Sequence, residues 1–369
     1  MVMKIYSKLI KVFGVLLIGI ALVSCEGDDG PGGGGNTDVR GAYILNEGAW
    51  GANNAGVAFY APDKDAEFIG DLYYSANNAN MGDLANDMIT YNGNIYVVVS
   101  GSKYVVCLNK KGEELARYSV VANEGEPRYI TASGDYVYVT QYGGKVSKFN
   151  SALERVATFD GGDNLEGITE VNGKLYVANA YKVEGSGYYV YNTEVLVIDT
   201  DAMTLEKSIE VVENPEQIKV VGGKLYVMSK GNYYDVNPAM QEVDVLTGKV
   251  TNITHTDKIT QGNNGLIYCV RSAYDASWNL TNQFFTYNPS SGEVSETSFL
   301  KNAPESFNTM AIYLLEVDEA TGDIYVGTSD YVTTGTIYRF DSDGVLKDTF
   351  DSGGINPKVM TFITPLKVE

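Results

Sequence analysis

The sequence predicts an all-β fold, a seven-bladed β-propeller whose first blade is closed by the C-terminal strand. Three observations predict it: a tyrosine-centred segment occurs seven times, the apolar runs are rich in β-branched and aromatic residues, and the last segment supplies a strand that the first repeat lacks. The chain has 369 residues, and about 330 follow its N-terminal region. That length alone suggests two domains, but the repeat favours one.

The repeat consists of a turn pair followed by a short apolar run around a tyrosine. The seven copies read "RGAYILN", "NGNIYVVV", "SGDYVYVT", "NGKLYVAN", "GGKLYVMS", "NGLIYCVR" and "TGDIYVGT". Their tyrosines recur every 38 to 57 residues and are Tyr43, Tyr96, Tyr138, Tyr176, Tyr226, Tyr268 and Tyr325. A period of 40 to 50 residues with several short strands in each unit is typical of propeller blades.

The first repeat begins the domain without an inner strand. "GGINPKVMTFI" (Gly353–Ile363) matches the inner-strand segment "VENPEQIKVV" (Val212–Val221) in its Asn-Pro pair and its apolar spacing. We therefore expect the last strand to complete the first blade. Closure of this kind removes the free sheet edges at which chains aggregate.

The N-terminal region is expected to lie outside the fold. Residues 1–24 combine basic residues with the apolar run "VFGVLLIGIALV", which is too short for a permanent membrane span, and "LVSC" resembles a lipoprotein lipobox. We expect a signal peptide over 1–24, lipidation of Cys25, a flexible tether over 25–38 and a single propeller domain over 39–369. The acidic residues after Cys25 resemble a surface-export signal, which favours an outer-membrane, cell-surface location. The alternative is an ordinary secretory signal followed by an unrelated cysteine.

The composition is strongly acidic, with a formal net charge of −20 that becomes −23 when the three lysines of the leader are removed. Such a surface repels nucleic acid and anionic lipid, so we expect no nucleic-acid partner. Cys107 and Cys269 lie in apolar strand-like runs, where buried free thiols are expected, although a disulfide between them stays open.

The loops predict a binding face. In a propeller, the turns between first and second strands lie on one face, and here they are short ("NGN", "GGK"). The loops between second and third strands lie on the other face with the blade-to-blade crossings. We call this the loop face. Its loops include "NEGAWGANNAG" and "RSAYDASWNLTNQ", which contain both tryptophans of the chain. Long loops on one face of a rigid scaffold commonly carry binding sites.

The residues that we expect to bind ligand are aromatic, amide or basic residues of that face. They are Asn46, Trp50, Asn53, Asn80, Arg128, Tyr142, Tyr181, Tyr189, Tyr233, Tyr234, Arg271, Tyr274, Trp278 and Tyr331. Glu166, Glu216 and Asn308, in the crossings, are further candidates for its rim or centre. The alternative is that the loops pack on one another and the tyrosines only cap the ring.

Catalysis is not expected. The chain has one histidine, His255, near a blade crossing, where we expect it to be solvent-exposed, and no serine or acid is placed with it by sequence. No Cys/His spacing suits zinc, so neither a metal nor a cofactor is predicted.

The sequence resembles a known family in "AYILNEGAWGANNAGVAFY", "LANDMITYNGNIYVV" and "EPRYITASGDYVYVTQY". With the lipobox and acidic tether, these segments resemble the YncE-like propeller lipoproteins of Bacteroidetes, closest to the BtuG group. The resemblance implies a surface lipoprotein that binds cobalamin (vitamin B12) or another corrinoid as a ligand on one face and passes it to a TonB-dependent outer-membrane transporter. Arg128, Arg271 or Lys182 would meet the corrinoid phosphate. A glycan- or protein-binding surface propeller is the alternative.

Overall fold

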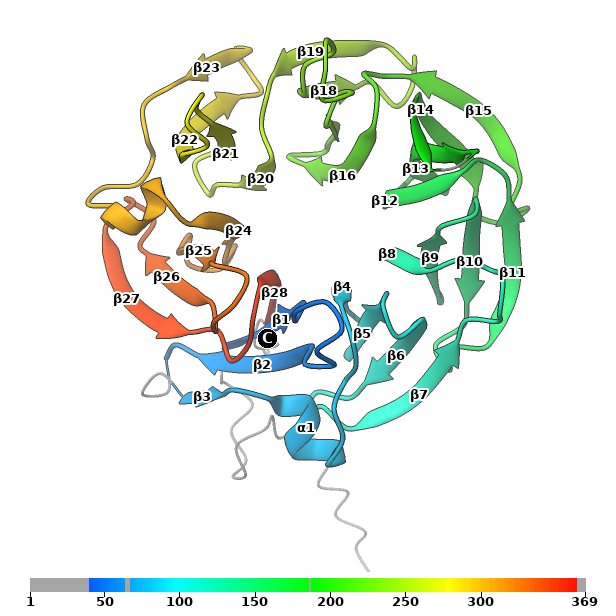
Figure 1. Cartoon of the computed structure of the whole chain (residues 1–369), viewed down its shortest axis with the longest axis horizontal. Helices are drawn as coiled ribbons and strands as arrows, with labels where there is room; N and C mark the ends of the chain where they lie inside the picture. Colours follow the sequence, from blue (N-terminus) through cyan, green and yellow to red (C-terminus); the bar gives the residue numbers. More distant parts are fainter. Residues whose placement is uncertain (1–39, 64–66, 186, 364–369) are drawn as a thin grey trace, which may run out of the picture.

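The computed structural model of the chain describes residues 40–63, 67–185 and 187–363. Over these residues the chain forms a ring of seven four-stranded antiparallel sheets around a central channel (Figure 1). The predicted all-β, seven-bladed propeller is confirmed. The expected signal peptide (1–24), Cys25 and the tether (25–38) lie outside the described residues. No helix among the described residues is long and apolar enough to cross a membrane.

Each blade contributes four strands, numbered outward from the channel. The inner strands are β28 (Pro357–Ile363), β4 (Ala85–Tyr91), β8 (Pro127–Ser133), β12 (Asn164–Val171), β16 (Pro215–Val221), β20 (Lys258–Gln261) and β24 (Ala311–Val317). The second strands are β1 (Gly41–Asn46), β5 (Asn94–Val99), β9 (Tyr136–Gln141), β13 (Lys174–Glu184), β17 (Lys224–Ser229), β21 (Ile267–Tyr274) and β25 (Ile324–Ser329).

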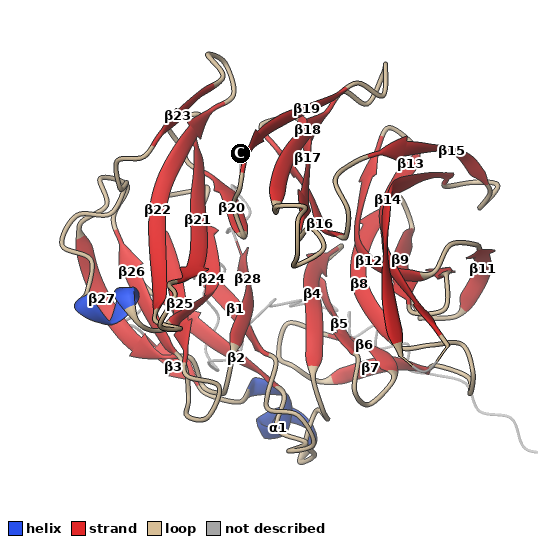
Figure 2. Cartoon of the chain, turned by 45° about the horizontal axis from the view of Figure 1, so that its top comes forward, coloured by secondary structure: helices blue, strands red, loops and turns tan. Residues whose placement is uncertain are grey.

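The third and fourth strands complete the blades. The third strands are β2 (Gly56–Ala61), β6 (Tyr104–Leu108), β10 (Lys145–Phe149), β14 (Tyr188–Asp199), β18 (Ala239–Val243), β22 (Leu280–Asn288) and β26 (Thr336–Phe340). The outer strands are β3 (Glu67–Ile69), β7 (Glu114–Ser119), β11 (Arg155–Asp160), β15 (Leu205–Glu210), β19 (Val250–Thr254), β23 (Glu293–Ser295) and β27 (Leu346–Asp351). A short helix α1 (Leu72–Asn77) and a 3-10 turn η1 (Glu305–Asn308) lie in two of the crossings (Figure 2).

The ring closes as predicted. Strand β28 pairs antiparallel with β1, from Gly41 opposite Ile363 to Asn46 opposite Pro357, so the first and last strands share one sheet (Figure 1). Asn356, just before β28, donates from Nδ2 to the carbonyl oxygen of Gly48 at 3.0 Å. The two ends of the chain therefore hold each other in register.

The core lies between the blades. The buried residues form seven apolar clusters, and each cluster joins two neighbouring blades. Strand β5 shows why: Ile95 and Val97 face the first blade, whereas Tyr96 and Val98 face the third. Both faces of each sheet are thus buried, and the seven repeated tyrosines are 0–5% exposed. Cys107 and Cys269 are buried and unpaired, as free thiols within this core.

Candidate ligand-binding face

Polar side chains surround one end of the central channel because repeated β-bulges aim them there. In six of the seven inner strands the pairing with the second strand shifts near the strand's first residues, once in five of them and twice in β12. A bulge leaves residues unpaired and turns their side chains out of the regular alternation. The residues skipped by these shifts include Lys358, Asn86, Arg128, Glu166, Glu216 and Tyr313, which we call the mouth ring.

Hydrogen bonds link one side of the mouth ring from blade to blade. Lys358 Nζ donates to Asn86 Oδ1 at 2.8 Å, and Asn86 Nδ2 donates to the carbonyl oxygen of Arg128 at 2.5 Å. Arg128 Nε donates to Glu166 Oε2 at 2.9 Å. Glu47, from the loop after β1, accepts from both Lys358 (2.8 Å) and Tyr313 (2.6 Å). These bonds cross between blades, so they fix the shape of the channel mouth.

On the other side of the channel mouth, Lys230 links two neighbouring blades through Glu216 and Asp257. It follows β17, and its Nζ lies 2.9 Å from Asp257 Oδ1 and 3.5 Å from Glu216 Oε2. Burial alone would lower the pKa of Lys230, but the carboxylates of Glu216 and Asp257 raise it overall. The ammonium is therefore charged at neutral pH and held between two blades.

Burial shifts the pKa values of the Arg128–Glu166 pair. Burial raises the pKa of the Glu166 carboxyl despite the opposing effect of Arg128. Burial by itself would lower the pKa of Arg128, but the carboxylate of Glu166 raises the pKa of Arg128 overall. Tyr142 donates its hydroxyl to Glu166 Oε1 at 2.7 Å, and its ring lies 4.7 Å from the Arg128 guanidinium carbon. Burial and the Glu166 carboxylate raise the pKa of Tyr142, so its hydroxyl stays protonated.

Beside the mouth ring lies a hollow of about 170 Å³ walled by tyrosines. Its lining, which we call the tyrosine hollow, consists of Tyr181, Tyr189, Tyr191 and Tyr233 over a polar base of Glu166, Asn214, Glu216 and Lys230. The rings touch in two groups: Tyr142 contacts Tyr181, which contacts Tyr189 at 5.3 Å between centroids, and Tyr191 contacts Tyr233 at 5.8 Å. Such a hollow offers flat apolar faces together with hydroxyl and amide groups.

Two segments that the sequence predicts as loops are in fact extended hairpins. Strands β13 and β14 pair as far as Glu184 opposite Tyr188, so Tyr181, Tyr189 and Tyr191 lie on strands. Strands β21 and β22 pair as far as Tyr274 opposite Leu280, with Trp278 in the connecting turn. The reason is the run of valine and tyrosine in "YKVEGSGYYVY", which favours pairing over an open loop. Tyrosines on paired strands are held more rigidly than loop residues.

A true loop carries Tyr233 and Tyr234. The Asn232 side chain accepts from the backbone N–H groups of Tyr234, Asp235 and Val236 at 2.9–3.0 Å. Gly231 has a φ of +67°, and a Cβ there would lie 2.0 Å from the carbonyl oxygen of Val236, so this turn requires glycine. The turn directs Tyr233 to the hollow and leaves Tyr234 almost fully exposed.

The tryptophans stand in solvent. Trp50 is 84% exposed and Trp278 is 83% exposed, and Tyr274 contacts Trp278 with ring centroids 6.2 Å apart. Tyr331, on the intervening blade, contacts Tyr313 of the mouth ring at 5.8 Å. The loop around Trp50 is ordered by Asp83, whose carboxylate accepts from the Gly51 N–H at 3.0 Å. These aromatics are thus surface groups rather than core residues.

Several predicted site residues have other surroundings. Asn46 is 1% exposed and donates to the carbonyl oxygen of Ser352 at 2.8 Å, so it joins the first blade to the last and does not reach the surface. Arg271 is engaged by Gln283 and Glu296, and Lys182 pairs with Glu184. Exposed side chains of the loop face include Asn53, Asn80 and Asn308.

None of the three predicted phosphate contacts is a free cation. Arg128 pairs with Glu166, Arg271 with Glu296 and Lys182 with Glu184. The residues that sequence reasoning did not select are Glu47, Lys230, Lys258, Tyr313 and Lys358. The available signal for Lys358 was a polar residue at the second position of the inner strand, which recurs in four of the seven inner strands, as in "NPEQI" and "NPKVM". The other four residues had no such signal.

The one histidine of the chain lies beside a carboxylate. His255 is half-buried instead of solvent-exposed, because its Nε2 lies 3.6 Å from Asp257 Oδ1. That same carboxylate oxygen accepts from Lys230. Within residues 40–63, 67–185 and 187–363, no group of three or more His, Cys, Asp or Glu side chains could hold a metal ion.

One known protein family matches almost the whole of the described domain. The family described as "Domain of unknown function (DUF5074)" matches residues 40–362, almost the whole propeller. No curated protein matches the chain.

Solved structures share the fold at low sequence identity. A proposed 6-phosphogluconolactonase from Bacteroides fragilis is 14% identical with a TM-score of 0.61, over 89% of this chain and 99% of its own. A second, from Bacteroides uniformis, is 13% identical with a TM-score of 0.59, over 88% of this chain and 100% of its own. BamB from Moraxella catarrhalis is 13% identical with a TM-score of 0.51, over 85% and 83%. At these identities the likeness concerns the fold alone.

Proposed function

The chain belongs to the DUF5074 family, and we propose that it is a binding propeller that captures a corrinoid such as cobalamin on its loop face. The observation that carries the proposal is the tyrosine hollow beside the mouth ring. The resemblance of segments in the first three blades to corrinoid-binding propeller lipoproteins supplies the ligand class.

The chemistry of the face suits this ligand. A corrinoid is broad and flat, with amide groups around its rim. Tyrosine rings of the hollow would contact its apolar surfaces, and Asn214 and the tyrosine hydroxyls would pair with its amides. The hollow is built on paired strands and on a network of ion pairs, so little conformational entropy is lost when ligand binds.

A spectral titration tests the proposal. Purified residues 26–369 are titrated with cyanocobalamin, and the visible spectrum of the corrinoid and the tryptophan fluorescence are followed. Saturable binding at micromolar ligand or below is expected. An unchanged spectrum and fluorescence throughout that range would exclude corrinoid capture.

Three substitutions locate the site. Tyr233→Ala is expected to weaken binding at least tenfold because it removes one wall of the hollow. Trp50→Ala and Trp278→Ala are expected to weaken binding with the fold intact, since both side chains stand in solvent. Tyr136→Ala, at the β8–β9 turn on the opposite face, is the matched control and should bind as the unchanged protein does. Equal ligand affinity in all four variants would show that the ligand does not bind on this face.

A second candidate is a glycan- or protein-binding role. Trp50, Trp278 and Tyr234 are each more than 80% exposed, and exposed aromatic faces also stack on sugars. A glycan array separates the two functions, because glycan binding without corrinoid affinity would favour this candidate. Under either proposal the protein is a binder and not an enzyme.

The cellular setting is part of the proposal. We place the protein at the outer membrane, anchored through a lipid on Cys25 and exposed at the cell surface, where it would pass ligand to a TonB-dependent transporter. Cys25→Ser should release the protein from the membrane fraction, and protease treatment of intact cells should degrade the anchored form. Retention of the Cys25→Ser variant in the membrane fraction would refute the anchor, and co-purification with a transporter tests the partner.

A further inference from the structure

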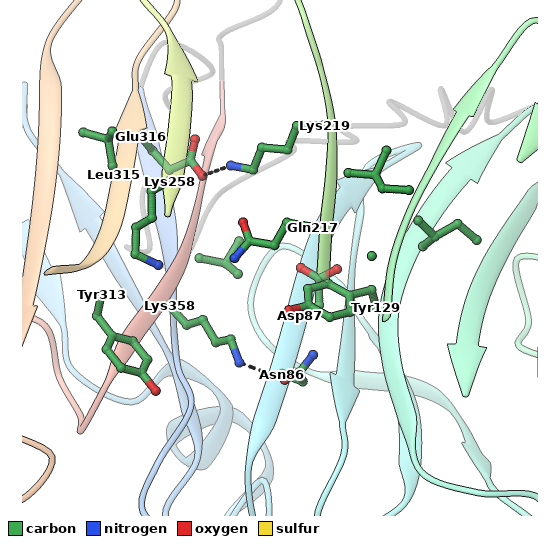
Figure 3. Close-up of a pocket in the computed structure, with 14 residues that line it drawn as sticks. Asn86, Asp87, Tyr129, Gln217, Lys219, Lys258, Tyr313, Leu315, Glu316 and Lys358 are labelled. Carbon is green, nitrogen blue, oxygen red and sulfur yellow. Dashed lines mark hydrogen bonds and ion pairs between the residues drawn. The ribbon is translucent and has the colours of Figure 1, made fainter. Parts of the chain in front are cut away.

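A cavity of about 180 Å³ lies inside the central channel and shares Asn86, Tyr313 and Lys358 with the mouth ring. Residues from all seven inner strands line it (Figure 3). The side chains that reach it are mostly polar, which is unusual for the centre of an otherwise apolar ring of blades. They include Asn86, Tyr129, Gln217, Lys258 and Tyr313.

Three lysines from three different blades border this one space. Lys219, Lys258 and Lys358 come from β16, β20 and β28, and all three line the cavity; in Figure 3 Lys219 is directed to Glu316 and Lys358 to Asn86. The chain as a whole has a net charge of −20, so a cluster of cations in its channel is a local reversal of charge. A fourth lysine, Lys230, lies close enough to act on Lys258 electrostatically.

The lysines differ in their partners. Lys219 donates to Glu316 at 3.1 Å, and Lys358 donates to Glu47 and Asn86 at 2.8 Å. Among the described residues, no acceptor lies within hydrogen-bonding distance of Lys258 Nζ. Its nearest specific contact is the ring of Tyr313, with Nζ 5.7 Å from the centroid. Lys258 is thus a partly buried cation with no counter-ion within hydrogen-bonding distance among the described residues.

The carboxylates near the cavity do not supply that counter-ion. Asp87 Oδ1 and Oδ2 accept from the backbone N–H groups of Met88 and Ile130 at 2.9 and 3.0 Å. Glu316 is paired with Lys219, and Asp257 with Lys230. Burial and the neighbouring lysines lower the pKa of Lys258 to about 8. A bound anion would offset this cost, because a buried charge is stabilised when it is paired and hydrogen-bonded.

We propose that this channel cavity binds a small oxyanion, phosphate or a phosphate group, with Lys258 as its principal contact. Lys358, on β28, lines the same cavity and supplies a second positive charge (Figure 3), whereas the hydroxyl of Tyr313 is directed to Glu47. The anion has two possible sources: free phosphate from solution, or the phosphate of a ligand bound across the mouth ring. The site itself does not depend on the corrinoid proposal.

Inorganic phosphate is the first probe. Residues 26–369 are titrated with phosphate at constant ionic strength, and binding is followed by calorimetry and by the phosphorus NMR line width. Saturable binding is expected, with affinity reduced at least tenfold in Lys258→Met. Lys111→Met is the matched control because Lys111 is exposed and is not part of the cavity lining, and it should bind as the unchanged protein does. Absence of binding, or equal binding in Lys258→Met, would overturn the site unless the second probe shows Lys258-dependent binding.

Two corrinoids distinguish the sources. Cyanocobalamin contains a phosphodiester, and dicyanocobinamide lacks it. If Lys258→Met weakens cyanocobalamin binding and leaves dicyanocobinamide binding unchanged, the site takes the ligand's phosphate. If only inorganic phosphate binding falls, the site takes a free oxyanion. If all three probes bind Lys258→Met as they bind the unchanged protein, the inference is wrong. If neither corrinoid binds at all, the corrinoid proposal fails and the phosphate titration alone decides.

A stability measurement covers the case in which a variant folds poorly. Ligands that bind only the native state raise the unfolding midpoint in proportion to the logarithm of their concentration. Phosphate should therefore raise the midpoint of the unchanged protein and of Lys111→Met. Sulfate, a second tetrahedral oxyanion, should do the same at constant ionic strength, whereas chloride should not. A midpoint independent of phosphate and sulfate would exclude a site for free oxyanions without any variant at Lys258, and would overturn the inference if cyanocobalamin binding is also independent of Lys258.

Discussion

Replacing Lys258 by methionine should make the protein more stable at neutral pH in phosphate-free buffer. The side chain lies in the channel cavity with no acceptor among the described residues, and burial together with Lys230, Lys219 and Lys358 lowers its pKa from 10.5 to about 8. This displacement of the pKa means that the charged ammonium costs the folded protein about 3 kcal/mol. Methionine has a similar length and carries no charge, so it removes this cost.

The sign of the pH dependence follows from which state binds the proton. Between about pH 8 and 10.5 the unfolded chain holds the Lys258 proton and the folded protein releases it, so the stability of the unchanged protein rises with pH in that window. The advantage of Lys258→Met should be about 3 kcal/mol below pH 8 and should disappear near pH 10.5. The other charges facing Lys258, from Lys219, Lys230, Lys358 and Asp257, remain in both proteins, so the difference between them isolates Lys258.

Thermal unfolding at several pH values measures the effect. A domain of about 330 residues unfolds with an entropy of roughly 0.7 kcal/mol/K, so 3 kcal/mol corresponds to a rise of about 4–5 °C in the midpoint at pH 7. Lys111→Met, at an exposed position, should shift the midpoint by much less. A Lys258→Met protein that is less stable at pH 7, or a difference that does not change with pH, would refute the reasoning.

Three further outcomes follow from the structure. Arg128→Met leaves the buried Glu166 carboxylate without its cation and should lower the free energy of unfolding by about 3–5 kcal/mol at pH 8. Because the pKa of Glu166 in the folded protein is already raised, this loss of stability should shrink toward pH 5 when it is measured by urea unfolding. An equal loss of stability at both pH values would contradict this reasoning. Burial raises the pKa of both thiols, that of Cys269 to about 12, so Cys107 and Cys269 should react with a thiol reagent at pH 8 only on unfolding, and rapid reaction of the native protein would show that they are accessible. Ending the chain after Gly353 removes β28 and exposes the edge of β1, so cooperative unfolding should be lost by circular dichroism; a sharp, unchanged transition would mean that ring closure contributes little.

The architecture was predictable because it depends on local signals. Turn pairs such as Gly222–Gly223 and the two-residue alternation of apolar side chains occur within each repeat, and every repeat gives the same signal again. The match between the segment of β28 and the inner strand of another repeat gave the closure of the ring. These features need no knowledge of which blades are neighbours in space.

The candidate site was predictable only in outline. Its face and several of its tyrosines followed from loop lengths, but Tyr181 and Tyr189 lie on an extended hairpin and Asn46 is buried. Strand pairing depends on the register of the partner strand, and burial depends on the neighbouring blade, so neither can be predicted from the sequence of one strand segment alone. The three basic residues expected to meet a phosphate are neutralised by Glu166, Glu184 and Glu296.

The sequence by itself determined the number of blades, the closure of the ring and the face that carries the aromatic residues. Only the tertiary structure decided which polar groups meet at the centre. Lys219, Lys258 and Lys358 are far apart along the chain and line one cavity because seven inner strands surround one channel. The β-bulges that aim the mouth ring arise from pairing between strands, and the partners of each charge come from other blades. A basic cavity within an acidic protein is therefore a property of the assembled ring and of no single repeat.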